Sequence, residues 1–146
     1  MTRMLTLDIC EAAGALQACS GIESGIEAAL HAMAHKFAEP NTHGLSLVEA
    51  SNAFNSLHRE STLDTVAQEC SAFHQYLSNT YQTPKRQHIS GSAGGQYTLS
   101  EEGCAQRDNS AMAYYSIAKS PIIDNLKENS TASQVWHADN ERLCHC

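Results

Sequence analysis

The chain has 146 residues, the length of a single domain, because one hydrophobic core usually occupies about 100–200 residues. Apolar residues make up 42% of the sequence and charged residues 17%, which is globular usage and excludes the low-hydrophobicity, high-charge class of disordered chains. Nine Lys and Arg residues against sixteen Asp and Glu give a formal charge of −7, which opposes binding to the phosphate backbone of nucleic acids.

Cysteine usage and hydropathy predict a soluble intracellular protein. The six cysteines include no Cys-x-x-Cys pair, and we expect them to be reduced thiols. Asp8 and Glu11 interrupt the apolar N-terminal stretch before the core of a signal peptide forms. No segment approaches the roughly 20 apolar residues of a membrane span, so no membrane partner is expected.

The N-terminal part of the chain predicts one helix. Residues 1–22 are small and weakly patterned, so little regular structure is expected there. Ser24 and Glu27 then have the spacing of a capping box, which predicts a helix that ends before Pro40. Apolar residues three or four positions apart give this helix its apolar face: Ile26, Leu30, Met33 and Phe37.

A strand and a second helical stretch follow. A short apolar run at 45–48, between the turn-like residues 41–44 and Asn52, predicts a buried strand that ends at Glu49. Between Ser61 and Pro84 the sequence predicts one helix or two. The apolar stripe of this stretch comprises Leu63, Val66, Cys70, Phe73 and Leu77.

The last third of the chain predicts a hairpin, a helix and a strand. Extended segments flank a glycine-rich turn at 90–95, which is typical of a β-hairpin. A helix capped by Asp108 or Asn109 is expected to bend at Pro121. The final strand begins at Val135 and turns at residues 139–140. This order of elements predicts a single α+β domain over residues 1–146, with helices on one face of a mainly antiparallel sheet.

Two carboxylates stand at the predicted strand ends, on Glu49 and Asp139. If the two strands are neighbours, these side chains lie side by side. Such a pair suits Mg²⁺, because Mg²⁺ takes one or two protein carboxylates and leaves the rest of its coordination shell to phosphates and water. The pattern therefore indicates a candidate divalent-metal site at the ends of the strands.

Three segments, in this order, resemble the palm motifs of retrotransposon-type reverse transcriptases, which are RNA-directed DNA polymerases. Residues 49–55 read EASNAFN beside the family's D-A-x-x-A-F-N, and residues 106–113 read QRDNSAMA beside Q-G-D-P-L-A-M-A. Residues 136–140 read WHADN, and the family has Y-A-D-D there. The resemblance covers about residues 17–143 and implies a polymerase-palm-like antiparallel sheet with helices on one face, truncated after the last palm motif.

The resemblance also implies site residues. Glu49, Asp139 and Asn140 stand at catalytic positions, and the first two match ligands of the Mg²⁺ or Mn²⁺ ions. Phe54 resembles the aromatic residue that screens the sugar 2′ position, and Gln106 the residue that lines the nucleotide pocket. The nucleotide-binding positions are Ala50, Phe54 and Gln106. The implied reaction is two-metal nucleotidyl transfer, and the implied partners are an RNA or DNA template-primer and a dNTP.

Departures from the family pattern predict that the activity is lost. Glu49 is one methylene longer than aspartate, which moves its oxygens by on the order of 1 Å, and Mg²⁺ tolerates little departure from octahedral geometry. Asn140 replaces a carboxylate, and Arg107 stands where the family has glycine. We therefore expect weak or absent metal and template binding, and a chain that is inactive by itself.

An alternative hypothesis is a non-enzymatic interaction or scaffold module, derived from a retroelement, that binds a protein partner through an exposed sheet edge. This hypothesis needs no metal and no nucleotide.

Other patterns predict a binding site only weakly. Glu27, His31 and His35 have a spacing that suits Zn²⁺ on one helix face, but a fourth ligand is missing and we expect a solvated polar face. The Cys-His-Cys segment at 144–146 offers soft ligands, yet fraying of a terminal segment opposes binding. Basic residues at 85–88 form a compact patch that exposure alone explains.

Overall fold

The structure is a computed structural model and describes residues 2–18, 22–91, 94–105, 108–137 and 140–145. For residues 2–5 and 140–145 it describes the backbone only. The helices are α1 (Thr2–Ala13), α2 (Gly25–Phe37), α3 (Arg59–Glu69), α4 (Ser71–Tyr81) and α5 (Ala111–Asn129). The strands are β1 (Gly44–Glu49), β2 (Lys85–His88), β3 (Tyr97–Ser100), β4 (Ser133–His137) and β5 (Asn140–His145). The architecture is α+β, as the sequence predicts.

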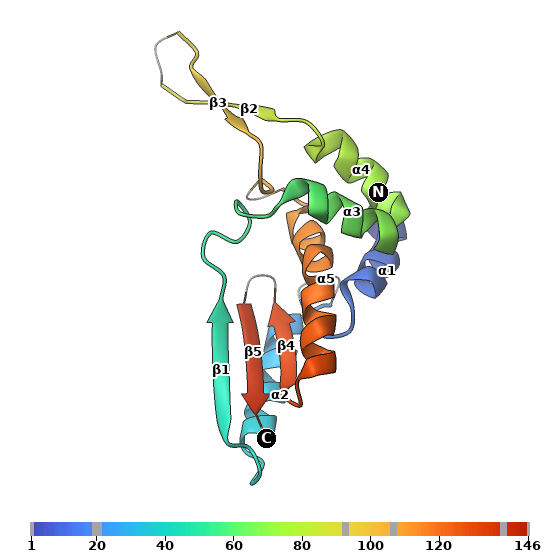
Figure 1. Cartoon of the computed structure of the whole chain (residues 1–146), viewed down its shortest axis with the longest axis vertical. Coiled ribbons are helices and arrows are strands. Elements are labelled where there is room, and N and C mark those ends of the chain that lie inside the picture. The colour runs from blue at the N-terminus through green and yellow to red at the C-terminus, as the bar shows by residue number, and fades with distance from the viewer. Residues whose placement is uncertain (1, 19–21, 92–93, 106–107, 138–139, 146) are drawn as a thin grey trace.

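The described strands form two antiparallel sheets. One has three strands in the order β1-β5-β4, and the other is the β2–β3 hairpin that the glycine-rich turn predicts. Helix α2 lies behind the three-stranded sheet and contacts β4 and β5 (Figure 1). The sequence predicts helices on one face of the sheet, and α2 takes that position. Helices α3 and α4 instead lie beyond the end of the sheet, where they pack with α1 and α5 (Figure 1).

The helical part holds the larger core. The predicted stripe of Leu63, Val66, Cys70, Phe73 and Leu77 is buried throughout, and it packs in one cluster with Tyr114 and Ile117 of α5. The stretch forms two helices, because the chain leaves helical geometry at Cys70, where φ is −150°. The cap of α3 is His58, whose ring Nδ1 accepts a hydrogen bond from the backbone N–H of Ser61.

Helix α5 continues through Pro121. A proline inside a helix lacks the N–H that would bond to the carbonyl four residues earlier, here that of Ile117. The hydroxyl of Ser120 donates to this carbonyl instead, at 2.8 Å, and both residues are buried. A polar partner inside the helix therefore replaces the hydrogen bond that the proline removes.

The N-terminal prediction is wrong: residues 2–13 form helix α1, which contacts α4 and α5. Ala12 and Ala13 are buried in the helical core, where small side chains allow close packing between helices. The helix ends where Gly14 adopts a φ of +79°, a conformation that glycine takes at little cost. The glycine ends this helix and does not prevent it.

Two details of α2 also differ from the prediction. Ser24 has a φ of 53° and its side chain makes no capping hydrogen bond, so the predicted capping box does not form. The residues that α2 buries are Gly25, Ala29 and Met33, whereas Ile26, Leu30 and Phe37 are exposed. A Cβ on Gly25 would lie 2.0 Å from the Ala18 carbonyl oxygen, so the small-residue face of α2 is the one that approaches its neighbours.

Strand β1 is confirmed as a strand, but the prediction that it is buried is wrong. It is an edge strand, and Leu45, Leu47 and Val48 are 43%, 65% and 45% exposed. At the opposite edge of the sheet, Trp136 of β4 is hydrogen-bonded to residues 16–18: its carbonyl accepts from the Ala18 N–H at 2.7 Å and its N–H donates to the Leu16 carbonyl at 2.9 Å.

None of the helices that the structure describes is long and apolar enough to cross a membrane.

Candidate functional site

Three strand ends meet at one end of the three-stranded sheet. β1 ends at Glu49 and β4 ends at His137, while β5 begins at Asn140. The antiparallel register pairs Asn140 with both Glu49 and His137. Directly opposed residues in such a ladder have Cα atoms about 4.5–5.5 Å apart. Residues from the first and the last of the sequence motifs are therefore neighbours here.

The side chain of Glu49 belongs to the open face of the sheet. Trp136 and Gln134 of β4 are buried on the face that α2 covers. Paired residues share a face and successive residues alternate, so Glu49, Leu47 and His137 lie on the opposite face. Glu49 is exposed there, and His137 is half-buried. A carboxylate and an imidazole thus face solvent from the same end of the sheet.

The described residues do not make a complete site for Mg²⁺ or Mn²⁺. In ranges 2–18, 22–91, 94–105, 108–137 and 140–145, no group of three or more His, Cys, Asp or Glu side chains is placed to hold a metal ion. Glu49 supplies one carboxylate at the strand ends, whereas Asp139 and Gln106 lie outside the described residues, as does the Asn140 side chain.

The segment after Glu49 packs against α5. The Phe54 ring lies 4.9 Å from the Tyr115 ring, centroid to centroid, with the planes tilted by 35°. The apolar cluster around them consists of Ala50, Ala53, Phe54, Leu57, Met112 and Tyr115. The first and the middle sequence motifs are thus in contact through their apolar residues. In this arrangement the half-buried Phe54 is a packing residue for the α5 N-terminal turns.

Backbone hydrogen bonds from Gly103 and Cys104 also hold the segment that follows Glu49. The N–H groups of Gly103 and Cys104 donate to the carbonyls of Leu57 and Phe54, both at 2.8 Å. Gly103 has a φ of +70°, and a Cβ on it would lie 2.5 Å from the Cα of Asn55. Glycine is therefore required here both for its backbone conformation and for the close approach of the two chains.

A buried arginine that the sequence did not single out fastens the 100–103 segment. Arg59, 6% exposed, donates from Nε to the Gly103 carbonyl at 2.6 Å and from Nη1 to the Ser100 carbonyl at 2.7 Å. Its Nη2 donates to the Ser100 hydroxyl at 2.7 Å and to the Glu102 carbonyl at 3.0 Å. The Glu102 carboxylate accepts from the backbone N–H of Arg59, at the N-terminus of α3, where a negative charge is favourable.

Tyr81 and Asp108 complete this network. The Tyr81 hydroxyl donates to the Asp108 carboxylate at 2.5 Å, and the same carboxylate accepts from the N–H and the hydroxyl of Ser110. The Tyr81 ring stacks on the Tyr114 ring and lies 5.4 Å from the Arg59 guanidinium. The sequence predicts Asp108 or Asn109 as the cap of this helix, but the N-cap of α5 is Ser110. Asp108 lies two residues earlier and accepts from the Ser110 N–H. The tyrosine that reaches Asp108 from α4 carries no signal in the sequence.

Burial and hydrogen bonds together determine the pKa values of the groups in this network. Burial, with the hydrogen bond to Asp108, raises the pKa of Tyr81, and burial raises that of Tyr114 to about 12. Burial and the Asp108 charge raise the pKa of Cys104 to about 11. Burial acts in the same direction on Asp108, but hydrogen bonds from Ser110 and Tyr81 outweigh it and lower the pKa of this carboxyl. At neutral pH the network holds neutral phenols around one carboxylate.

Alkaline pH is expected to destabilise the fold through this network. Tyr81, Tyr114 and Cys104 have raised pKa values in the folded protein. The stability that depends on their protonated forms is therefore complete below the unfolded pKa values of about 8.5–10, and it is lost as the pH rises from there through the higher pKa values of the folded state. Asp108 has the opposite sign: its stabilisation is present above an unfolded pKa of about 3.9 and is lost as the pH falls.

Urea unfolding at several pH values between about 7 and 11 checks this expectation. The free energy of unfolding should decrease over that range, and it should decrease less in Tyr81→Phe, which has no phenol to titrate at this position. An equal decrease in both proteins would contradict the assignment of Tyr81.

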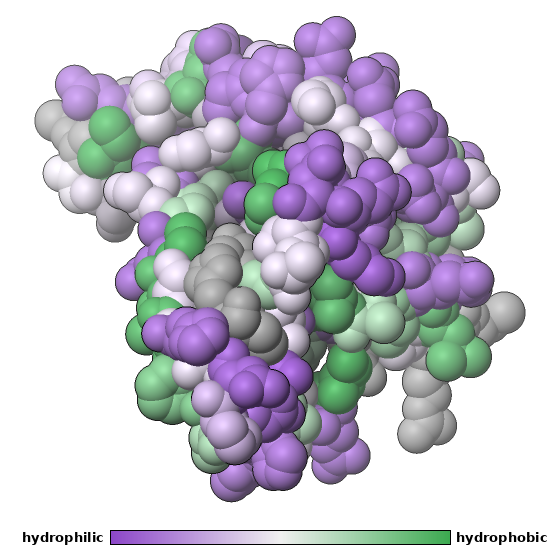
Figure 2. Space-filling model, turned by 60° about the horizontal axis from the view of Figure 1, so that its bottom comes forward, coloured by the Kyte–Doolittle hydropathy of each residue, from purple (hydrophilic) through white to green (hydrophobic). Residues whose placement is uncertain are grey.

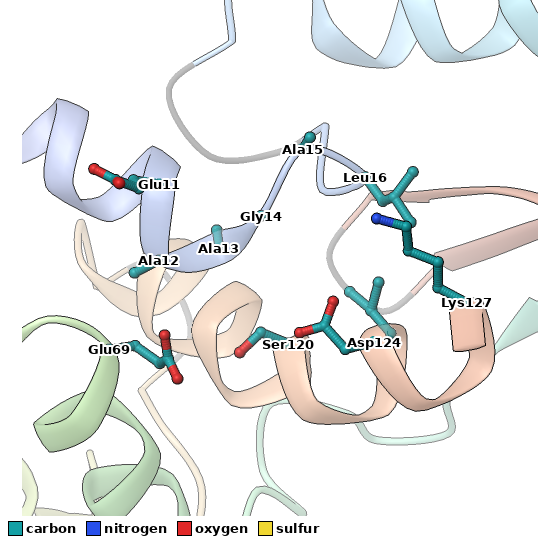
Figure 3. A pocket seen from close by; sticks show the side chains of 11 residues that line it. Glu11, Ala12, Ala13, Gly14, Ala15, Leu16, Glu69, Ser120, Asp124 and Lys127 are labelled. Carbon is teal, nitrogen blue, oxygen red and sulfur yellow. The ribbon is translucent and has the colours of Figure 1, made fainter. Parts of the chain in front are cut away.

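A cavity between α1, α3 and α5 lies apart from the sequence motifs. It has a volume of about 170 Å³ and is lined by residues 11–16, Glu69 of α3, and Ser120, Ile123, Asp124 and Lys127 of α5 (Figure 3). None of these residues belongs to the three motif segments. The lining includes three carboxylates, one lysine and the alanines of residues 11–16, and in Figure 3 the three carboxylates do not point toward one another.

The weaker sequence patterns are exposed in the structure. Glu27, His31 and His35 all face solvent on α2. The basic residues of β2 are exposed as well, and the Arg86 guanidinium lies 4.8 Å from the Tyr97 ring in the hairpin. For residues 144–146 the side chains lie outside the described part. Cys70 and Cys104 are free thiols.

Comparisons with known proteins leave the family open. No model of a known protein family matches the chain, and a search of the curated proteins returns no match.

Proposed function

We propose that the chain is a reverse-transcriptase-like palm unit in which the residues for two-metal nucleotidyl transfer are degenerate, so that it does not polymerise DNA by itself. The observation that supports this proposal is the register of the sheet. It pairs Glu49, at the position of the first metal-ligating aspartate, with Asn140, the residue that follows Asp139 in the sequence. Two-metal chemistry needs carboxylates from both of these motifs side by side.

The middle motif supports the proposal independently. Its residues Ala111 to Ala113 begin α5, and Met112 packs in the same apolar cluster as Ala50 and Phe54 of the first motif. Segments far apart in the sequence, which were matched to the family by residue type alone, thus lie next to one another. A chance likeness of short motifs has no reason to produce this proximity.

The loss of activity follows from the residues at the metal-ligand positions. An amide at Asn140 removes a negative charge beside the metal position, and the longer Glu49 side chain displaces the remaining carboxylate. Mg²⁺ needs near-octahedral oxygen ligands at short distances, so both changes weaken its binding. The formal charge of −7 also opposes the approach of a template-primer.

Reversing the two departures tests the proposal. Mn²⁺ affinity, measured by titration calorimetry, should be undetectable or weak in the wild type and should rise by at least about tenfold in Glu49→Asp/Asn140→Asp. The gain should exceed the sum of the two single variants, because both carboxylates bind the same ion. Adding Asp139→Ala should remove the gain. In primer extension on an RNA template with Mn²⁺, the wild type should give no product.

The matched control makes the same two changes elsewhere, as Glu60→Asp/Asn79→Asp, at exposed positions on α3 and α4. This variant should bind Mn²⁺ as the wild type does. Strictly additive effects of Glu49→Asp and Asn140→Asp would contradict the proposed palm site, and primer extension by the wild type would contradict the proposed loss of activity.

One observation favours a second candidate, a non-enzymatic interaction module. The free edge of the sheet is formed by β1, in which Leu47 is 65% exposed. Apolar edge strands are surfaces on which other strands add by backbone hydrogen bonds.

A further inference from the structure

The edge strand β1 exposes apolar side chains and lacks the residues that usually prevent an edge strand from pairing with another strand. β1 contains no lysine and no proline, and its one charged residue, Glu49, is at its end. Natural edge strands are usually protected by such residues, by bulges or by covering segments. Instead, Leu45, Leu47 and Val48 are each more than two-fifths exposed. Figure 2 shows hydrophobic side chains along the left margin, the side of the molecule on which Figure 1 places β1.

The two edges of the sheet differ in this respect. At the β4 edge, the backbone of Trp136 is bonded on both its N–H and its carbonyl to residues 16–18. In the described part of the chain, β1 has β5 as its strand partner on one side, and its other side forms the edge. Strand addition at β1 therefore yields a closed pair of molecules and does not continue into a fibre.

We propose that two copies of the chain pair through their β1 strands, antiparallel about a two-fold axis, to form a continuous six-stranded sheet. The inference goes beyond the proposed function, since it requires neither a metal nor a nucleotide. The argument for a second copy as the occupant is that β1 is complementary to itself.

Symmetry restricts the possible registers. A two-fold axis perpendicular to an antiparallel pair passes through two identical residues, so each register is defined by the residue at its centre. With Ser46 at the centre, Leu45 of one copy is opposite Leu47 of the other. In the same register Glu49 is opposite His43, an exposed residue one position before the strand. All four side chains lie on the open face of the sheet, because their numbers differ by two.

The neighbouring registers lack this match. Centring on Leu47 places Leu45 opposite Glu49, and centring on Leu45 places Leu47 opposite His43. Only the register centred on Ser46 pairs apolar side chains with apolar ones and the carboxylate with an imidazole. Opposed pairs of these kinds stabilise antiparallel strands, whereas mismatched ones do not.

The pairing also determines where the two α2 helices lie. A two-fold axis perpendicular to the sheet keeps both α2 helices on the same face of the combined sheet. On that face Val48 is 45% exposed, and α2 exposes Ile26, Leu30 and Phe37. Pairing of six-residue strands alone gives a small interface, so a dissociation constant of about micromolar order is expected.

Sedimentation over about a hundredfold range of protein concentration tests the proposal. The wild type should pass from monomer to dimer, without larger species. Leu45→Lys/Leu47→Lys should weaken the dimer by at least about tenfold, because it sets lysines opposite lysines in the proposed register. The matched control Leu7→Lys/Ile122→Lys changes two equally apolar residues, 78% and 49% exposed on α1 and α5, and should sediment as the wild type does.

A charge exchange tests the register itself. His43→Glu should weaken the dimer, since it opposes Glu49 with a second carboxylate, and His43→Glu/Glu49→Lys should restore it. Circular dichroism of each variant checks that the fold is retained. The proposal is overturned by a wild type that stays monomeric at every concentration, by a dimer that survives the two lysines at 45 and 47, or by failure of the charge exchange to restore pairing.

Discussion

Replacing Arg59 with methionine is expected to lower the free energy of unfolding by about 3–5 kcal/mol. Methionine keeps much of the volume but donates no hydrogen bond. Four acceptors of the 100–103 segment then lose the donor that Arg59 provides: the carbonyls of Ser100, Glu102 and Gly103, and the Ser100 hydroxyl. The Gly103 acceptor is buried with the arginine, and leaving such groups without a donor costs about 1–3 kcal/mol each. Urea unfolding at neutral pH measures the loss.

The control for this prediction is Arg86→Met, which removes the same charge from an exposed strand of the hairpin. Its effect should be within about 0.5 kcal/mol of zero, as for most surface substitutions. Similar losses in the two variants would indicate that the net charge, and not the hydrogen bonds of Arg59, determines the stability.

Replacing Gly103 with alanine is expected to lower the free energy of unfolding by about 2–4 kcal/mol. Two costs combine at this position. The backbone has a φ of +70°, which an L-residue with a Cβ adopts only with strain, and the new methyl group would lie 2.5 Å from backbone atoms of Phe54 and Asn55. Backbone atoms cannot rotate away as a flexible side chain can, so the two segments must separate. Thermal or urea unfolding detects the change.

Gly91→Ala separates the two costs. Gly91 has a φ of +78°, but a Cβ there would meet nothing within 4 Å. This variant should therefore lose only the conformational part, about 1 kcal/mol. If Gly91→Ala and Gly103→Ala lose the same amount, the close approach of the 103 and 54–55 backbones contributes nothing to stability.

Both substitutions act on the support of the candidate site. Arg59 holds the 100–103 segment, and Gly103 and Cys104 hold the backbone of Phe54 and Leu57. That backbone leads directly from Glu49 at the end of β1. We therefore expect Gly103→Ala to reduce the Mn²⁺ affinity gained by restoring the two carboxylates, even though Gly103 is no ligand of the metal.

Elements with a local residue pattern could be predicted from the sequence. The stripe from Leu63 to Leu77 predicted a helical, buried segment, because a period of three to four residues reports which side of a helix avoids water. The hairpin around 90–95 and the strand ending at Glu49 follow from turn residues and short apolar runs in the same way. The motif positions 49–55, 106–113 and 136–140 were also visible as residue types in order.

Tertiary structure alone decided which of these elements meet and which faces are covered. The pairing of Glu49 with Asn140, the contact of Phe54 with Tyr115 and the bonds of Arg59 all join residues distant in the sequence. Local patterns carry no signal for such partners. The apolar runs predicted burial of β1 and of Ile26, Leu30 and Phe37 in α2, yet these residues are exposed. Hydrophobicity gives a preference for leaving water, but burial also requires a neighbouring surface. For β1, we infer that a second copy of the chain provides this surface.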